Sequence, residues 1–98
     1  MTDQPDGAAR IAAERQRQIE SEGFDPAHDA QYTKGELARA AGCYARPPEL
    51  RGAHASLHWP WLPEFWKPTP QDRIHELEKA GALCAAEIDR LLALETGT

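Results

Sequence analysis

All three tryptophans of this chain lie within eight residues of one another, in a segment interrupted by a proline every few positions. Residues 58–68 of this segment read HWPWLPEFWKP. Proline has no backbone N–H and disfavours helical geometry in the residue before it, so this segment cannot be an α-helix. Because so many exposed aromatic rings would form a large apolar patch, we expect the segment either to cover the protein's own core or to contact a ligand or partner.

The remainder of the chain has the composition of a helical protein. It contains no valine, few other β-branched residues and many alanines, and no window alternates apolar and polar residues with the period of a strand. A chain of 98 residues has room for one domain with a small core. We therefore predict an all-α fold in which a disordered segment, residues 1–7, precedes a single helical domain, residues 8–95. Its three helices are expected at about residues 8–22, 34–45 and 70–95, with the aromatic segment inside a long loop, residues 46–69.

The first two predicted helices differ in what is expected to stabilise them. The first is polar on most sides, and we expect pairs four residues apart, such as Arg10 with Glu14, to contribute to its stability. In the second, Thr33 and Glu36 have the spacing of a capping box. Its apolar face is predicted from four residues at helical spacing, which are Leu37, Ala40, Ala41 and Tyr44.

The third predicted helix has the strongest periodic pattern in the chain. Its start is marked by Thr69 as the N-cap, followed by Pro70. Apolar or small residues then recur at alternating spacings of three and four, at Ile74, Leu77, Gly81, Cys84, Ile88 and Leu91. Alanines beside this seam would let another helix approach closely. We therefore expect this helix to pack against two partners at once. The protein is expected to self-associate through it as a homo-oligomer.

The charge and apolar content of the chain exclude several classes of function. A net charge of −5 argues against binding to a nucleic-acid backbone, which requires clustered lysines and arginines. No segment approaches the roughly 20 apolar residues of a membrane span, and the N-terminus has no apolar signal core, so we expect a cytoplasmic protein. Cys43 and Cys84 fall on apolar faces of predicted helices, and we expect both to be buried free thiols.

Neither a metal site nor a catalytic site has a strong signal in the sequence. His54 and His58 have a spacing that binds metals on a helix, but it falls in the predicted loop, so we expect no native metal and no other cofactor. Glu76 and Glu87 share one face of the third helix, which leaves open a Mg²⁺-dependent all-α nucleoside triphosphate pyrophosphohydrolase. Because a lysine and an arginine lie on that face too, a solvated ladder of salt bridges is the favoured interpretation.

Seven short motifs occur in a fixed order along most of the chain. They are ERQRQ at 14–18, EG at 22–23, HD at 28–29, GELA at 35–38, WPW at 59–61, WKP at 66–68 and KAGAL at 79–83. Over about residues 12–92 this set resembles a group of short uncharacterised proteins encoded by tailed phages and prophages. The chain differs from that pattern at Phe24, where tryptophan is usual, and at Ala30, where a second aspartate is usual. The resemblance implies a phage accessory protein, a setting in which small proteins often blunt host defence, and it brings no catalytic residue.

The residues best suited to chemistry favour binding over catalysis. The sequence has no nucleophile elbow and no Gly-rich phosphate loop, whereas its aromatic rings can stack on a nucleobase and its basic side chains can hold phosphate. The candidate ligand-binding residues are Arg15, Arg17, His28, Tyr32, Trp59, Trp61, Lys67 and Arg73. Trp66 instead precedes a helix and resembles a hydrophobic staple. We hypothesise that the protein sequesters a nucleotide signal of host immunity, with direct inhibition of a host defence protein as the alternative.

Overall fold

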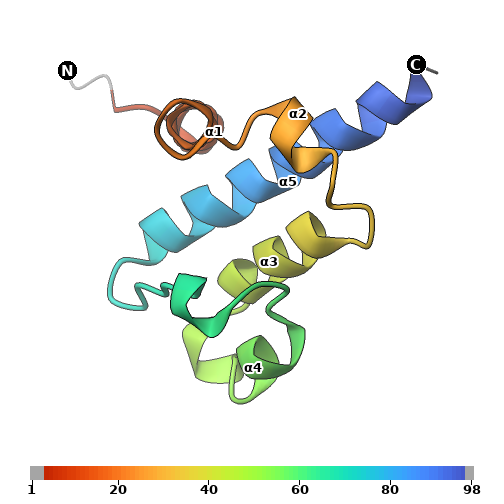
Figure 1. Cartoon of the computed structure of the whole chain (residues 1–98). Coiled ribbons are helices and arrows are strands. Elements are labelled where there is room, and N and C mark those ends of the chain that lie inside the picture. The colour runs from red at the N-terminus through yellow and green to blue at the C-terminus, as the bar shows by residue number, and fades with distance from the viewer. Residues whose placement is uncertain (1–3, 97–98) are drawn as a thin grey trace.

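The computed structural model describes residues 4–96 and contains five α-helices (Figure 1). They are α1 (Gly7–Glu22), α2 (Pro26–Asp29), α3 (Glu36–Ala45), α4 (His54–His58) and α5 (Arg73–Glu95), with 3₁₀-helices at Pro48–Leu50 and Pro63–Phe65. Since no strand occurs in the described range, the predicted all-α fold class is confirmed. Across the same residues, no helix is both long and apolar enough to cross a membrane. Residues 1–3 of the predicted disordered segment lie outside the described residues.

Two stretches are more regular than the sequence predicts. The long connection between α3 and α5 contains α4 and both 3₁₀-helices instead of a continuous loop. The short helix α2 forms outside the three predicted helices, because the Asp25 side chain accepts a hydrogen bond from the His28 backbone N–H and Pro26 occupies the first turn. Local capping therefore creates helices that are too short to show apolar periodicity.

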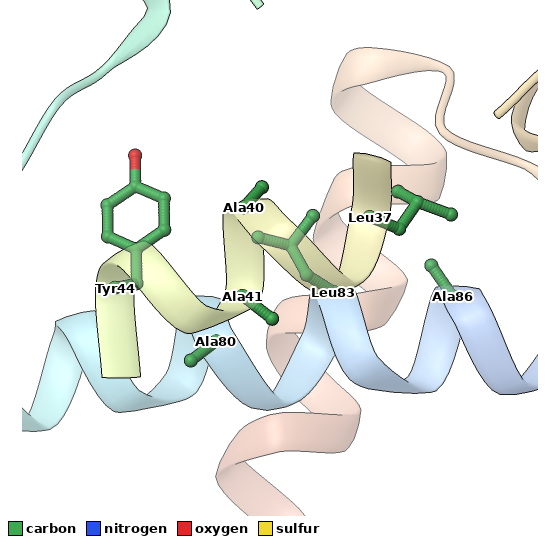
Figure 2. Close-up of a cluster of buried hydrophobic side chains, with 7 residues drawn as sticks. All are labelled: Leu37, Ala40, Ala41, Tyr44, Ala80, Leu83 and Ala86. Carbon is green, nitrogen blue, oxygen red and sulfur yellow. The ribbon is translucent and has the colours of Figure 1, made fainter. Parts of the chain in front are cut away.

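α3 and α5 lie side by side, run in opposite directions and form the hydrophobic core (Figure 1). Four of the seven clustered buried side chains are alanines, and such small side chains allow the two helices to approach closely (Figure 2). The predicted apolar face of α3 is confirmed, because all four of its members are buried. A core of this kind is thin, and Tyr32 and the three tryptophans complete it as half-buried side chains packed around it.

α1 crosses α5 steeply, so that it is seen almost end-on where α5 lies in the plane of the view (Figure 1). At Gly81 the absence of a side chain admits Ile11, three of whose side-chain carbons lie within 3.0 Å of the position that a Cβ would take. Nearby, Arg10 pairs with Glu78 of α5, so the predicted pair with Glu14 is wrong. The centre of the predicted seam on α5 therefore packs against α1 and is not a continuous surface for a second copy.

Away from this crossing, the seam residues are exposed. Ile74 is 61 % exposed, Ile88 is 56 % exposed and Leu91 is 44 % exposed. Both cysteines are free thiols, but only Cys43 is buried, and the expectation that Cys84 is buried is wrong. Two of the buried alanines of α5, Ala80 and Ala86, belong to the core cluster with α3, so the seam and the core face of this helix are different surfaces.

The starts of α3 and α5 also differ from the sequence predictions. α3 begins after Gly35, which has a φ of 78°, and no side chain caps it, so the predicted capping box at Thr33 is wrong. α5 begins after Asp72, whose side chain accepts a hydrogen bond from the His75 backbone N–H, and not after Thr69. The later start leaves the Thr69 backbone N–H available for a contact that positions the site.

Candidate functional site

The aromatic segment folds back against Tyr44 at the end of α3. The centre of the Tyr44 ring lies 4.8 Å from that of Trp66 and 5.7 Å from that of Trp59. Trp61 continues the row, at 5.3 Å from Trp59 and 5.3 Å from Tyr32. Tilted and edge-on ring contacts in this distance range stabilise aromatic pairs beyond the burial of their area. The rings form a continuous wall from the end of α3 to the turn after α2.

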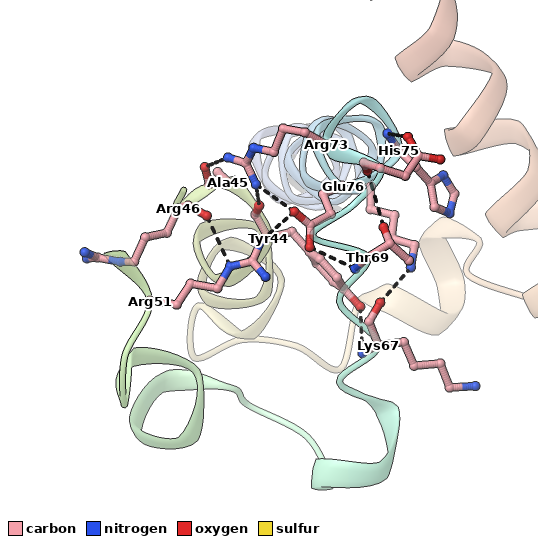
Figure 3. Close-up of polar contacts among 11 residues, drawn as sticks. Tyr44, Ala45, Arg46, Arg51, Lys67, Thr69, Arg73, His75 and Glu76 are labelled. Carbon is pink, nitrogen blue, oxygen red and sulfur yellow. Dashed lines mark hydrogen bonds and ion pairs between the residues drawn. The ribbon is translucent and has the colours of Figure 1, made fainter. Parts of the chain in front are cut away.

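A buried carboxylate in the first turn of α5, that of Glu76, holds the long connection in place (Figure 3). It accepts hydrogen bonds from Arg51, from Arg73 and from the Thr69 backbone N–H. Burial raises the pKa of Glu76, but the hydrogen bonds outweigh burial, and its pKa lies below the ordinary value. Because Arg73 also donates to the Tyr44 carbonyl, this network ties α3, α5 and both ends of the connection together.

A groove with a volume of about 1160 Å³ lies between the aromatic wall, α1 and α5. Tyr32, Trp59 and Trp61 line the wall side, and Leu83 belongs to the α5 side. Small-molecule sites in proteins are mostly apolar pockets of roughly 300–1,000 Å³ with a few polar groups that fix the ligand. The groove is large enough for a ligand of nucleotide size, so its polar groups decide which ligand it suits.

Two lysines of the groove lining form no direct ion pair with a carboxylate in the described residues. None of the ion pairs among residues 4–96 involves Lys67 or Lys79. The Lys79 ammonium donates to the Lys67 carbonyl at 3.2 Å and lies 5.0 Å from the centre of the Tyr44 ring. Burial lowers the pKa of Lys79, because a partly desolvated ammonium group is less stable than one in water. An anion bound at this position would stabilise the Lys79 ammonium group.

The groove also contains buried acceptors without donors. Gln18 is 5 % exposed, and its Oε1 has no hydrogen-bond partner among the described residues. Asp29 is 1 % exposed; its Oδ1 lies 3.0 Å from Nδ1 of His28, and its Oδ2 is 3.5 Å from Arg15, an ion pair without a hydrogen bond. The Trp61 Nε1 is likewise buried, with no acceptor in the described part of the chain. Unsatisfied buried polar atoms are uncommon in proteins, and a water molecule, an ion or a ligand can complete their contacts.

Five of the eight predicted ligand-binding residues line this groove, namely Arg17, Tyr32, Trp59, Trp61 and Lys67. The guanidinium group of Arg17 is already held by two carboxylates, at 2.8 Å from Glu14 and 2.7 Å from Glu22. The hydrogen bonds that Arg17 donates to Glu14 and Glu22 raise the pKa of Arg17, so it remains a cation. Of the predicted cations, Lys67 is therefore the one in the groove whose charge is not already paired.

The other three predicted ligand residues have structural contacts outside the groove lining. Arg15 is buried and donates to the Phe24 carbonyl and to Asp89 of α5. The His28 ring stacks on Phe24, with 5.3 Å between ring centres. Arg73 belongs to the buried network around the first turn of α5. These residues brace the corner between α1 and α2 and the start of α5, and the groove depends on them only indirectly.

The acids considered for metal-dependent hydrolysis are already bound by arginines. Glu87 accepts hydrogen bonds of 2.8 and 2.9 Å from Arg90. Glu76 is buried, so the predicted solvated ladder of salt bridges is wrong at this residue. His54 and His58 lie on α4 and not in a loop, with ring centres 4.5 Å apart. Residues 4–96 hold no group of three or more His, Cys, Asp or Glu side chains placed to hold a metal ion.

Six polar or charged residues of the groove are absent from the sequence-based candidates, namely Glu14, Gln18, Glu22, Asp29, His75 and Lys79. A signal for Lys79 was available, because it lies four residues before Leu83 and so shares the inward face of α5. Gln18 gave no such signal, since α1 is polar on nearly every side. The burial of Asp29 depends on α2, which the sequence pattern did not predict.

The groove thus combines an aromatic wall, two ammonium groups without acidic partners in the described residues, and buried acceptors that lack donors. Such a combination suits an anionic ligand that also carries a flat ring with N–H or O–H groups. The residues that create it come from α1, α2, α5 and the aromatic segment. No protein-family model, curated protein or solved structure matches this chain.

Proposed function

We propose that the groove binds a nucleotide-type ligand and that the protein holds this ligand without converting it. One observation carries the proposal: Lys67 and Lys79, which have no acidic partner in the described residues, line the same groove as Trp59 and Trp61. Aromatic faces stack on nucleobases, and ammonium groups bind phosphate as compact positive charges. A ligand that joins a flat ring to a phosphate matches both parts of the lining.

Sequestration suits these residues better than hydrolysis. A Mg²⁺-dependent hydrolase needs carboxylates that are available to the ion, whereas Glu76 and Glu87 are committed to arginines. The resemblance to short proteins of tailed phages supports a role in counter-defence. In that role the protein removes a nucleotide immune signal from the cytoplasm of the bacterial host by binding it.

Isothermal titration calorimetry with native mass spectrometry tests the proposal. The probes are AMP, ADP-ribose, 3′,5′-cyclic AMP and cyclic di-AMP. We expect at least one of them to bind, and Lys79→Met to weaken that binding about tenfold or more, because a charge-assisted hydrogen bond is lost. Lys34→Met is the matched control, since it removes an exposed lysine outside the groove lining, and it should leave the affinity unchanged. Absence of binding by every probe would contradict the proposal.

We also propose that the protein forms a homo-oligomer through the C-terminal half of α5. Its support is the exposure of Ile88, Leu91 and Leu92, at 56 %, 44 % and 51 %. Contiguous exposed apolar side chains favour association. Native mass spectrometry should find the wild type as an oligomer and Ile88→Glu as a monomer. A monomeric wild type would contradict the proposed oligomer. It would favour the second candidate function, in which a host defence protein covers these leucines. That protein would then be captured without nucleotide.

A further inference from the structure

We infer that the groove selects a base with an exocyclic amino group, such as adenine or cytosine, over its carbonyl counterpart, such as hypoxanthine or uracil. The inference rests on the proposed function, because it names the part of the nucleotide that Gln18 and Asp29 contact. Both residues are more than nine-tenths buried, line the groove and present oxygen atoms without hydrogen-bond donors from residues 4–96. An amino group carries two N–H donors, which is the complement of two acceptors.

The orientation of the Gln18 amide is fixed by its neighbour in α1. Its Nε2 donates to Oε2 of Glu14 at 3.3 Å. A hydrogen bond from Arg17 lowers the pKa of Glu14, so this carboxylate is ionised and can only accept. The amide must therefore direct its nitrogen to Glu14, which leaves Oε1 as an acceptor for the groove. A buried acceptor without a donor costs stability, and a ligand that donates to it recovers that cost.

Asp29 supplies the second acceptor at the same corner of the fold. The Phe24 backbone N–H donates to the Gln18 carbonyl, and this turn leads directly into α2, which carries Asp29. The carboxylate has contacts with His28 and Arg15, but Oδ2 accepts no hydrogen bond from the described residues. Hydrogen bonds to an ionised group are stronger than those between neutral groups. An N–H donor of the ligand would therefore gain most at this oxygen.

The surrounding rings indicate how the ligand is oriented. The Tyr32 backbone N–H donates to the Asp29 carbonyl, and the Tyr32 ring lies 5.3 Å from that of Trp61. On the Tyr44 side, the Lys67 backbone N–H donates to the Tyr44 hydroxyl, and the Lys79 ammonium lies 5.0 Å from the centre of the Tyr44 ring. A base on the Tyr32 side and a phosphate on the Tyr44 side bring each part of a nucleotide to its complement. A carbonyl base in the same position would set oxygen against the two acceptors, and polar sites reject such mismatches strongly.

Matched nucleotide pairs that differ at this one group test the inference by calorimetry. The pairs are AMP with IMP, CMP with UMP, and ADP-ribose with its hypoxanthine analogue. The ribose is constant within each pair, so donors on the sugar cancel. We expect the amino member to bind about tenfold more tightly than the carbonyl member. Equal affinities within the pairs that bind would overturn the inference and leave the proposed function intact. Failure of every probe to bind would contradict the proposed function itself.

A variant of the acceptor gives a second measurement. Gln18→Met keeps the length of the side chain and removes both amide groups, so we expect its AMP to IMP affinity ratio to fall to about half of the wild-type ratio or less, with Asp29 retaining the remainder. Gln16→Met, which changes an exposed glutamine of the same helix, should keep the wild-type ratio. An unchanged ratio in a folded Gln18→Met protein would overturn the assignment. If that variant does not fold, the comparison of AMP with IMP on the wild type decides.

Discussion

Two charged clusters border Tyr44, and they differ in how completely their groups are matched. Around Glu76, one buried carboxylate meets three donors, two of them arginines. In the groove, Lys67 and Lys79 have no acidic partner and Gln18 has an acceptor with no donor, as far as the described residues go. A matched buried charge fixes geometry, whereas the half-buried Lys79 and the exposed Lys67 keep their charges available to a ligand. The first cluster therefore maintains the fold, and the second is the place for a ligand.

The tryptophans divide between the same two clusters. Trp66 lies against the matched cluster, with the Arg51 guanidinium 5.4 Å from the centre of its ring. Trp61 lines the groove, and its Nε1 lacks an acceptor in the described residues. Both rings are half-buried, so exposure alone does not separate them. If the comparison of the clusters is right, substitutions at the two rings should affect different properties.

Removal of the central carboxylate should have the largest effect. Glu76→Ala leaves Arg51 and Arg73 without their counter-charge and creates a cavity, and we expect it to lower the free energy of unfolding by about 4 kcal/mol. Urea unfolding measures the loss. Glu64→Ala is the control, because it removes an exposed acid from the aromatic segment and should change stability by less than about 0.5 kcal/mol.

The pH dependence of stability provides an independent check on this cluster. The pKa of Glu76 in the folded protein lies below its ordinary value of 4.5, so its contribution is present above that value and is lost as the pH falls through the lower folded pKa. The stability difference between wild type and Glu76→Gln should therefore shrink under acid conditions. A difference that stays constant with pH would show that Glu76 does not act as a matched charge.

The tryptophan substitutions should have the next largest effect and separate the clusters most directly. We expect Trp66→Ala to destabilise the protein by about 3 kcal/mol and Trp61→Ala by about half as much, because one face of Trp61 lines the groove. Nucleotide affinity should show the reverse order, with a loss of about tenfold for Trp61→Ala from lost stacking. If both variants destabilised the protein equally and bound nucleotide with equal affinity, the whole aromatic segment would only cover the core.

Two glycine substitutions test the close contact between α1 and α5, the two helices that carry the polar groups of the unmatched cluster. Ala at position 81 would overlap with Ile11, and we expect Gly81→Ala to lower the free energy of unfolding by about 2 kcal/mol. Gly42→Ala is the matched control in α3: nothing lies within 4 Å of its added Cβ, and it should raise stability by about 0.5–1 kcal/mol. Thermal unfolding measures both. Stabilisation by both substitutions would contradict the close contact with Ile11.

The sequence predicts the fold class and the core of this protein more completely than its polar contacts. The apolar face of α3 follows directly from helical periodicity, since Leu37 and Tyr44 lie two turns apart. The prediction for the centre of the seam on α5 is wrong, because periodicity identifies an apolar surface but not the element that covers it. In the sequence Gly81 is one more small residue of that seam, whereas its specific role, to admit Ile11, exists only after folding.

The candidate site shows the same limit for charged residues. Aromatic and basic side chains near the tryptophans indicated much of the groove, and five of the eight candidates line it. For Arg15 and Arg73, the sequence cannot distinguish an arginine that contacts a ligand from one that pairs with Asp29 or Glu76. Pairing partners distant in sequence decide this. The converse holds for Lys79, since Glu76, its acid at helical spacing, is bound by Arg51 and Arg73 instead.

The smallest expected effect concerns the protonation of Lys79. Burial lowers the pKa of Lys79 from its ordinary value of 10.5, and only the ammonium form binds phosphate well. The phosphate of AMP keeps its charge above about pH 7, because its second pKa is near 6. Affinity for AMP should therefore fall, by about tenfold or less, as the pH rises toward 10.5 through the lowered pKa.

Lys79→Met should remove this dependence, and Lys34→Met should retain it, because Lys34 is exposed and outside the groove lining. A wild-type affinity that stays flat from neutral to alkaline pH would remove Lys79 from the site and leave its ammonium group as a structural contact of Tyr44. If Lys79 binds the phosphate, the affinity must instead fall as the pH rises. The matched carboxylate makes folding sensitive to acid, and the unmatched lysine makes binding sensitive to base, so the two responses should occur at opposite ends of the pH range.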